Sequence, residues 1–342
     1  MKRPEPLQQG DPIRIIAPAG WIQPSDIAAA IDLFNAWGLK VEMGKHLFER
    51  KHLFSADDPE RLEDLQAALD DPELKAILCA RGGYGSHRIV DQLDLEQFTK
   101  HPKWLIGFSD ITVLHCHLQR LAGVESLHGV MAKGIQTETP AAVTEGVHRA
   151  LKGETIAYRL AGHPKNVPGE AMGILTGGNL SILYSLQGTA SEPEWEGRIL
   201  FVEEVGETHY HVDRMLVTMK RRGVLAKIAG LVVGQMSEIT HLTPGMERDI
   251  EDTIREQVEE YNIPVLFGFP AGHEPDNRVL IMGRQVQMKV QEKQSELLFL
   301  TDVVEEEKPG RARQLVTTAL VMTFFFLLIW ALYHFLFRTY LG

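Results

Sequence analysis

Short apolar runs alternate with amphipathic segments of helical period along the first half of the chain, and this alternation limits the fold more than any other feature. Buried parallel strands read as continuous apolar runs, and each needs a crossover helix to reach the next strand. The runs that we predict as strands are residues 13–17, 39–43, 76–80 and 104–108. The sequence therefore predicts an α/β fold with a parallel sheet wrapped by helices.

Helix signals lie between these runs. One helix is predicted to start at Pro24-Ser25 and to end at Gly38, because proline suits the first turn and glycine the end of a helix. Asp58 can cap a second helix that has Pro59 at its first position. We predict a third over residues 86–97 and a fourth from Ile111 onward. Each strand of the sheet is thus followed by a helix.

The second half is richer in strand signals and predicts a smaller C-terminal α/β domain. Predicted strands are residues 171–176, 199–205, 230–234, 265–269 and 279–282, and predicted helices are residues 181–186, 214–222 and 246–261. The polar, Pro- and Gly-bearing stretch 152–170 reads as a linker. We therefore place an N-terminal domain at residues 1–151 and a C-terminal domain at residues 171–304.

The last part of the chain predicts a membrane anchor. Residues 315–337 carry no formal charge and are long enough to cross a hydrocarbon core of roughly 30 Å. The alternative, a buried terminal core helix, usually keeps a polar stripe. Residues 305–314 are the expected hinge, and three of them are basic while only Arg338 follows the span. The positive-inside rule then places the body on the cytoplasmic face of the inner membrane.

Composition excludes several classes of function. The formal net charge of -11 argues against nucleic-acid binding, which needs clustered Lys and Arg. The two cysteines, Cys79 and Cys116, lie in apolar stretches and predict no disulfide. No metal or cofactor is expected, because neither H-E-x-x-H nor a complete nucleotide loop is present.

Two turns at the ends of predicted strands carry the chemistry. Arg81-Gly-Gly-Tyr-Gly85 can point backbone N–H groups at a ligand, because its glycines tolerate positive φ. Gly107-Phe-Ser-Asp110 places Ser109 between a strand and a helix, as in a nucleophile elbow. The second glycine of that pattern is missing, and Ser109 could equally be an ordinary helix cap. These residues alone leave both interpretations open.

A larger set of motifs resembles the LD-carboxypeptidase family in order and spacing. They are Arg81-Gly-Gly-Tyr-Gly85, Gly107-Phe-Ser-Asp110, Leu127-His-Gly129, Thr176-Gly-Gly-Asn-Leu180, Leu200-Phe-Val-Glu-Glu-Val-Gly206 and Gly272-His273. The resemblance spans about residues 13–303. It implies a Rossmann-like, class I glutamine amidotransferase-like N-terminal domain, a homodimer, and a serine peptidase that removes terminal D-alanine from murein tetrapeptide in peptidoglycan recycling.

The resemblance also implies the roles of individual residues. Ser109 would be the nucleophile, His273 the base and Glu203 the acid that orients the base. Glu204 competes with Glu203, because only one of two adjacent strand residues can face the site. The backbone N–H of Asp110 would hold the oxyanion. Gly82 or Gly83 would supply the second donor.

Two residues are candidates for substrate binding. Arg81 could pair its guanidinium with the terminal carboxylate of a peptide, although a structural arginine is an equal alternative. Asn179 could contact substrate, although asparagine after two glycines is more often a turn residue. Two other functions stay open: a microcin-immunity-type hydrolase of aminoacyl-nucleotide amides, and a catalytically silent muropeptide binder docked at the membrane.

Overall fold

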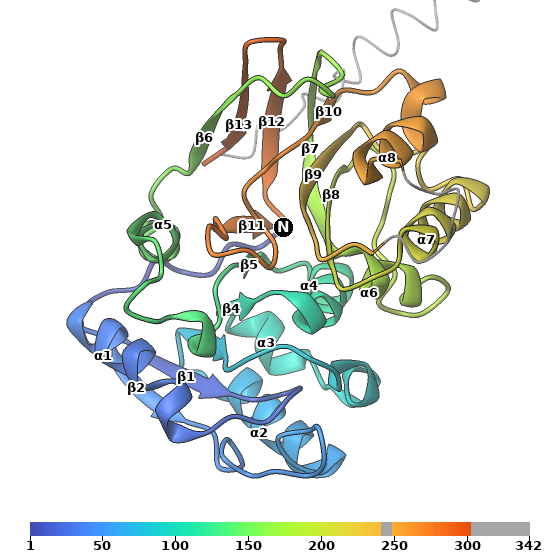
Figure 1. The fold of residues 1–342 in the computed structure, drawn as a ribbon. Helices are drawn as coiled ribbons and strands as arrows, with labels where there is room; N and C mark the ends of the chain where they lie inside the picture. The colour runs from blue at the N-terminus through green and yellow to red at the C-terminus, as the bar shows by residue number, and fades with distance from the viewer. Residues whose placement is uncertain (241–247, 302–342) are drawn as a thin grey trace, which may run out of the picture. The chain divides into compact units, whose positions relative to one another are not determined.

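A six-stranded sheet organises the first part of the chain (Figure 1). The computed structural model describes residues 1–240 and 248–301, and Met1–Thr301 form one unit. In spatial order the sheet runs β11-β5-β4-β3-β1-β2, and all its neighbours are parallel except β11, which is antiparallel to β5. The strands are β1 Pro12–Ile16, β2 Lys40–Met43, β3 Ala76–Cys79, β4 Trp104–Gly107, β5 Ser126–His128 and β11 Leu280–Met282.

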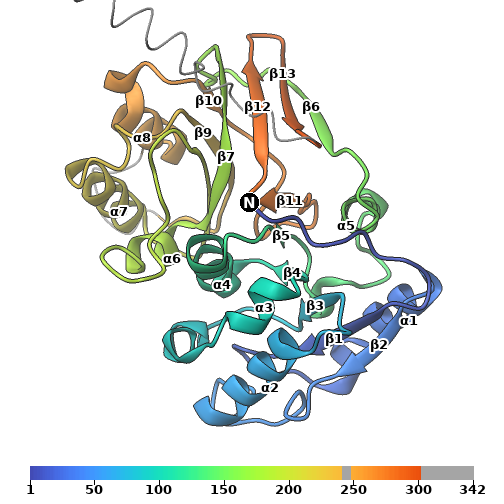
Figure 2. The ribbon, with the colours of Figure 1, turned by 180° about the vertical axis from the view of Figure 1, so that it is seen from behind.

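Helices cover both faces of this sheet, as Figures 1 and 2 show. Successive strand side chains point to opposite faces, so Ile15 of β1 packs with α1 and α5 while Ile16 packs with α2, α3 and α4. The helices are α1 Ala28–Ala36, α2 Asp58–Asp70, α3 Glu96–Lys100, α4 Thr112–His117 and α5 Ala141–Leu151. The predicted α/β fold of the N-terminal part is confirmed.

The strand order places a crevice where ligands usually bind in such folds. The chain moves from β1 to β2 in one direction and from β3 to β4 in the other, so β1 and β3 form a switch point. At their carboxyl ends the N–H of Gly20 donates to the carbonyl of Gly82 over 3.2 Å. The turn after β4, which begins with Phe108, lies beside this point.

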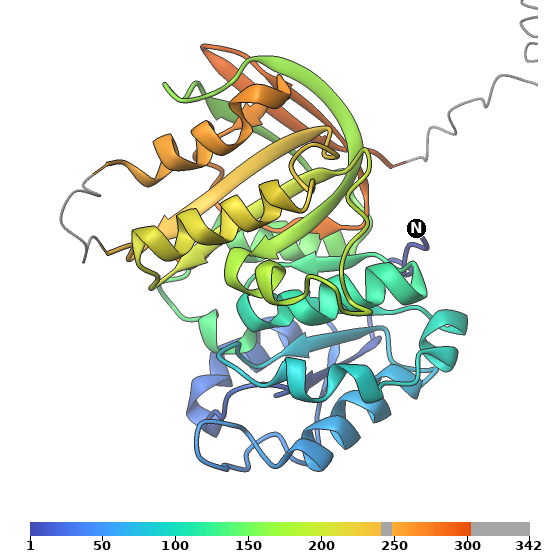
Figure 3. The same ribbon diagram turned by 90° about the vertical axis from the view of Figure 1, so that its right-hand side faces the viewer.

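A seven-stranded mixed sheet forms the second part of the fold. Its order is β10-β9-β8-β7-β12-β13-β6, with parallel pairs from β7 to β10 and antiparallel pairs from β7 to β6. The long strand β7 curves strongly (Figure 3). The strands are β6 Ala157–Ala161, β7 Gly169–Asn179, β8 Ile199–Val205, β9 Gly230–Ser237, β10 Val265–Leu266, β12 Gln285–Val290 and β13 Gln294–Phe299.

Three helices pack on the parallel half of the second sheet: α6 Leu180–Ser185, α7 His209–Arg221 and α8 Ile250–Val258. Leu180 of α6 and Leu114 of α4 belong to one buried apolar cluster, which therefore joins the two parts of the fold. The described part of the chain thus has the predicted two-domain α/β fold. The first sheet was expected to be parallel and is mixed, because β11 pairs with β5 in antiparallel fashion.

Several predicted elements differ from the structure. The helix predicted at residues 86–97 is wrong: two short 3-10 turns, Ser86–Arg88 and Val90–Gln92, precede α3. Leu93 is extended there, and the side chain of Asp94 accepts the N–H of Glu96, which starts a new helix. Strand β6 lies within the stretch predicted as a linker. Strand β11, predicted as part of the second domain, completes the first sheet.

The prediction of a membrane anchor is corrected. Among residues 1–240 and 248–301, no helix combines the length and apolarity needed to span a bilayer. Residues 315–337, on which the prediction rested, lie outside the described part of the chain. We therefore withdraw both the transmembrane helix and the location at the cytoplasmic face of the inner membrane.

Candidate active site

Ser109 lies in a strained turn between β4 and α4. Its φ is +63°, in the left-handed region that residues with a Cβ seldom adopt. Phe108 before it is extended, and a 3-10 turn, Ser109–Ile111, leads into α4. A Cβ at Gly107 would lie 2.9 Å from the Ile111 side chain, so only glycine lets the helix approach this closely. Strain of this kind at the end of a strand is typical of a nucleophile elbow.

The glycine turn after β3 lies directly against Ser109. A Cβ at Gly82 would be 3.1 Å from Ser109 Oγ and 3.5 Å from the backbone nitrogen of Asp110. Gly83 has a φ of +113°, which favours glycine. The absence of a side chain at position 82 therefore leaves room beside the serine hydroxyl.

Asp110 also holds the glycine turn in place. Its side chain is buried, and Oδ2 accepts the backbone N–H of Ser86 at 2.9 Å. Oδ1 has no hydrogen-bond partner among the described residues. The residue predicted to supply an oxyanion N–H thus also fixes the turn that carries Gly82 and Gly83.

Glu203 and His273 are in contact, although they are far apart in sequence. His273 Nδ1 lies 2.8 Å from Glu203 Oε2. The Glu203 side chain is fully buried at the end of β8, whereas that of His273 is 19% exposed. Burial raises the pKa of the Glu203 carboxyl, and the hydrogen bond from His273 acts in the opposite direction. A buried carboxylate that orients a partly exposed imidazole is the arrangement of a catalytic acid and base.

The loop before His273 allows this contact because Gly272 lacks a side chain. A Cβ at Gly272 would lie 3.2 Å from Glu203 Oε2 and 2.9 Å from Gln235 Cβ, and its φ is +145°. Gln235 also holds the loop, because its side chain accepts the N–H of Glu274 at 2.8 Å and donates to the carbonyl of Asp276 at 2.9 Å. Sequence reasoning missed Gln235, which no motif marked.

Glu204, the competitor for the orienting role, points the other way. Its carboxylate accepts hydrogen bonds from Asn179 Nδ2 at 2.9 Å and from the backbone N–H and hydroxyl of Ser181 at 2.7 and 2.6 Å. Asn179 Oδ1 in turn accepts the N–H of Ile182 as the cap of α6. Glu204 and Asn179 therefore hold the start of α6, and the buried amide of Asn179 is occupied by these bonds.

The Arg81 side chain makes one long hydrogen bond and no ion pair within the described residues. Its Nη1 donates to the carbonyl of Trp21 at 3.4 Å. No carboxylate of residues 1–240 or 248–301 lies within salt-bridge distance of its guanidinium. The Arg81 side chain lies at the switch point, against Gly20. Its charge is therefore available to an anionic group.

Phe108 links the turn that carries Ser109 to the loop that carries His273. Within the described residues no hydrogen bond joins Ser109 Oγ to His273, but the ring of Phe108 packs 4.9 Å from the His273 ring. Phe108 and His273 also line one cavity of about 330 Å³. Its remaining walls are residues Val130, Gly134, Gln136, Glu138, Thr139, Pro140, Gly272, Glu274, Pro275 and Asn277. Both domains thus contribute to the cavity at the predicted base.

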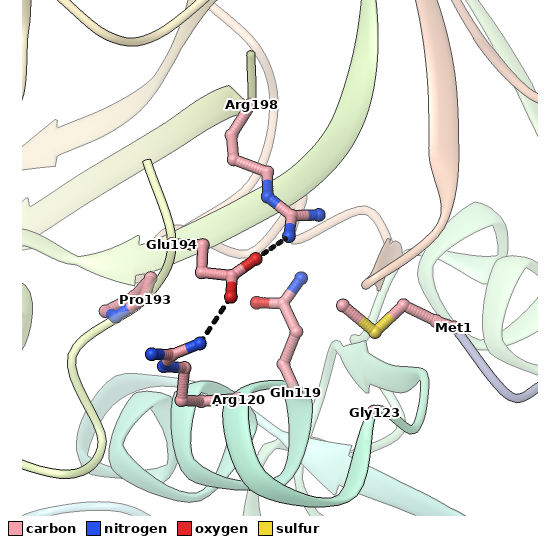
Figure 4. Close-up of a pocket in the computed structure, with 7 residues that line it drawn as sticks. All are labelled: Met1, Gln119, Arg120, Gly123, Pro193, Glu194 and Arg198. Carbon is pink, nitrogen blue, oxygen red and sulfur yellow. Dashed lines mark hydrogen bonds and ion pairs between the residues drawn. The ribbon is translucent and has the colours of Figure 1, made fainter. Parts of the chain in front are cut away.

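A second pocket, of about 170 Å³, has no catalytic character (Figure 4). In it Glu194 binds Arg120 on one side and Arg198, at 2.8 Å, on the other. None of the predicted triad residues lines this pocket. The acidic side chain between two guanidinium groups is an ion pair that joins the helical turn after α4 to the segment before β8.

Three histidines with the chemistry of metal ligands have hydrogen-bond partners within the protein. His115 contacts Ser126 and the carbonyl of Gly107, each at 2.8 Å, and His117 contacts Ser191. Ligand atoms of His46, Glu49 and Glu60 lie within 4.8 Å of one another, a cluster that sequence reasoning missed. His46 Nδ1 is already hydrogen-bonded to Glu49 at 2.6 Å.

Comparison with known proteins decides the family. Models of the LD-carboxypeptidase N-terminal domain and C-terminal domain match residues 13–129 and 172–288. The chain belongs to the LD-carboxypeptidase family. A probable murein peptide carboxypeptidase of Bacillus subtilis (strain 168) is 34% identical over 297 residues, which cover 85% of this chain and 92% of that protein. The chain is thus an enzyme of the carboxypeptidase class.

Solved structures of this family share the fold. The muramoyltetrapeptide carboxypeptidase from Oxalobacter formigenes superposes with a TM-score of 0.78 at 29% identity, covering 84% of this chain and 98% of that chain. The microcin C7 self immunity protein MccF, in complex with aspartyl sulfamoyl adenosine, gives a TM-score of 0.77 at 21% identity, covering 86% and 98%. The second likeness concerns the fold alone.

Proposed function

We propose that this LD-carboxypeptidase releases the terminal D-alanine from murein tetrapeptide with a Ser109, His273 and Glu203 triad. The observation that carries the proposal is the contact of 2.8 Å between His273 and the buried Glu203. His273 also lines a cavity together with Phe108, the residue before Ser109. The similarity to murein peptide carboxypeptidases supports the substrate class.

In the proposed reaction Ser109 Oγ attacks the carbonyl carbon of the scissile peptide bond. His273 Nε2 takes the hydroxyl proton, and Glu203 stabilises the resulting imidazolium through Nδ1. The tetrahedral oxygen accepts hydrogen bonds from the N–H groups of Asp110 and of Gly82 or Gly83, each worth about 3 kcal/mol. The C–N bond then breaks as His273 returns the proton to the amine of D-alanine.

Water completes the cycle. It attacks the acyl-enzyme ester while His273 accepts its proton, and the ester C–O bond breaks to release the tripeptide and the Ser109 hydroxyl. Ser109 and His273 share no hydrogen bond in the described structure, and catalytic hydrogen bonds are often long until substrate is bound. The proposal therefore places the hydrogen bond between Ser109 and His273 in the substrate complex.

Arg81 is the proposed receptor for the terminal carboxylate. Its guanidinium has no carboxylate partner in the described part of the chain and lies beside the glycine turn. A carboxypeptidase needs such a cation near its nucleophile, since its substrates end in a free carboxylate. Asn179 is not included, because its amide holds α6.

The experiment compares the full-length wild type with Ser109→Ala on murein tetrapeptide. We expect the wild type to release D-alanine and the variant to be at least about 10³-fold slower. Equal release by both would overturn the serine mechanism. Release by neither would leave the silent-binder alternative, and cleavage of an aminoacyl-nucleotide amide instead of the peptide would favour the immunity-type activity. The predicted homodimer can be measured on the same samples by light scattering.

A further inference from the structure

Strand β5 ends in His128, a buried residue for which the proposed mechanism has no use. The side chain has no exposed surface, and neither ring nitrogen has a hydrogen-bond partner among the described residues. Burial lowers the pKa of His128 well below its ordinary value, so the ring is uncharged. A buried polar group without partners costs about 1–3 kcal/mol and calls for a functional explanation.

His128 is one of four rings that pack in a row, which we call the aromatic column. In order, the rings are His273, Phe108, His128 and Phe201. The ring centroids of His273 and Phe108 are 4.9 Å apart, those of Phe108 and His128 5.7 Å, and those of His128 and Phe201 5.0 Å. Two of these contacts are edge-on, at 61° and 82°. Such edge-to-face pairs are favourable geometries for aromatic rings.

The aromatic column connects the three segments that carry the proposed triad. Phe108 immediately precedes Ser109, Phe201 lies two residues before Glu203 on β8, and His273 is the proposed base. His128 is held in place by the pairing of β5 with Gly107 of β4 and Leu280 of β11. A ring fixed in the first sheet therefore contacts a ring of the second sheet.

We propose that His128 is a positioning residue, an uncharged aromatic spacer that holds Phe108 against His273 and so sets the base relative to Ser109 and Glu203. No described residue is hydrogen-bonded to its ring nitrogens, so the ring contacts with Phe108 and Phe201 are the interactions on which the proposal rests. An uncharged spacer also places no like charge beside the imidazolium that forms at His273. The turnover readout for this proposal rests on the proposed function.

The test uses full-length His128→Ala, His128→Phe and the control Phe98→Ala, which removes a buried ring of α3 outside the aromatic column. We expect His128→Ala to lower kcat for murein tetrapeptide roughly 10²-fold with KM nearly unchanged, because small displacements of catalytic groups have effects of this size. Compared with His128→Ala, the His128→Phe variant should regain most of the wild-type kcat and have a higher Tm. Phe98→Ala should lower the Tm without lowering kcat.

A second readout is independent of turnover. In proton NMR, the downfield signal of the His273 Nδ1–H bonded to Glu203 should weaken in His128→Ala and return in His128→Phe. If His128→Ala does not fold, Phe108→Ala replaces it. The double variant Phe108→Ala, His128→Phe should then have a kcat and an NMR signal no higher than those of Phe108→Ala alone.

Two results would overturn the proposal that His128 is an aromatic spacer. One is a His128→Ala protein with wild-type kcat and an unchanged NMR signal. The other is a His128→Phe protein as impaired as His128→Ala, since nitrogen atoms and not the ring would then be required. A wild type that releases no D-alanine but shows the expected NMR series would refute the proposed substrate and leave the spacer intact.

Discussion

His273 Nδ1 lies 2.8 Å from Oε2 of Glu203, a carboxylate with no exposed surface. This contact predicts that Glu203→Gln lowers kcat roughly 10⁴-fold, because the amide cannot stabilise the imidazolium. The rate of D-alanine release measures the effect. Glu204→Gln is the matched control. The Glu204 carboxylate accepts hydrogen bonds from Ser181 at the start of α6, so this variant should have a lower Tm but a kcat within a few-fold of wild type. Equal losses of kcat in the two variants would contradict the assignment.

The raised pKa of Glu203 predicts a pH-dependent effect on stability. Burial favours the protonated acid, so the folded state is stabilised by this group at low pH and loses that stabilisation as pH rises through the folded pKa. The side-chain amide introduced by Glu203→Gln carries no charge at any pH. We therefore expect the Tm of the variant, relative to wild type, to increase as pH rises above the ordinary range of a glutamate. A difference that is constant with pH would show that the pKa is not raised.

The close approach of Gly82 to Ser109 predicts that Gly82→Ala is catalytically poor. The new methyl group would lie 3.1 Å from the hydroxyl and occupy the proposed oxyanion site, which should cost roughly 10² in kcat. Gly123→Ala provides the control, because Gly123 has φ +65° with open space around it. That variant should lose about 1 kcal/mol in urea unfolding and keep its kcat. Equal activity of the two variants would argue against the oxyanion site.

The Arg81 guanidinium has no carboxylate partner among the described residues, which predicts that Arg81→Met weakens binding of a free carboxylate. Loss of a charge-assisted hydrogen bond of about 2 kcal/mol should raise KM roughly thirtyfold. A peptide whose terminal carboxylate is amidated provides the second arm. Wild type should bind that peptide poorly, and the variant should bind it no worse than wild type does. A thirtyfold difference on the amidated peptide as well would assign Arg81 to the structure of the turn.

Sequence reasoning predicted β1 to β4 of the first sheet, of which β3 and β4 are continuous buried apolar runs, and missed the three-residue strand β5. It missed β12, in which only alternate residues such as Val286 and Met288 are buried between polar ones. It also assigned β11 to the wrong sheet, because pairing between Leu280 and His128 is set by the tertiary fold.

For the site, motifs named Ser109, Glu203 and His273 as candidates, but local sequence could not decide between Glu203 and Glu204. Adjacent residues of a strand face opposite sides of the sheet. Which side of β8 faces the site depends on where the tertiary fold places β7, α6 and the His273 loop. His128 belongs to the Leu127-His-Gly129 motif. Its proposed role depends on burial and on ring contacts, which the sequence alone does not show.

The pairing of β11 with β5 has a consequence for biosynthesis. The sheet that carries Ser109 keeps an open edge until Leu280–Met282 have been made, and His273 precedes that strand by only a few residues. A ribosome therefore holds an incomplete sheet, and the proposed nucleophile without its proposed base, until residues 273–282 have been made. We expect the nascent chain to stay inactive up to that point, and the unpaired edge of β5 to need protection until β11 covers it.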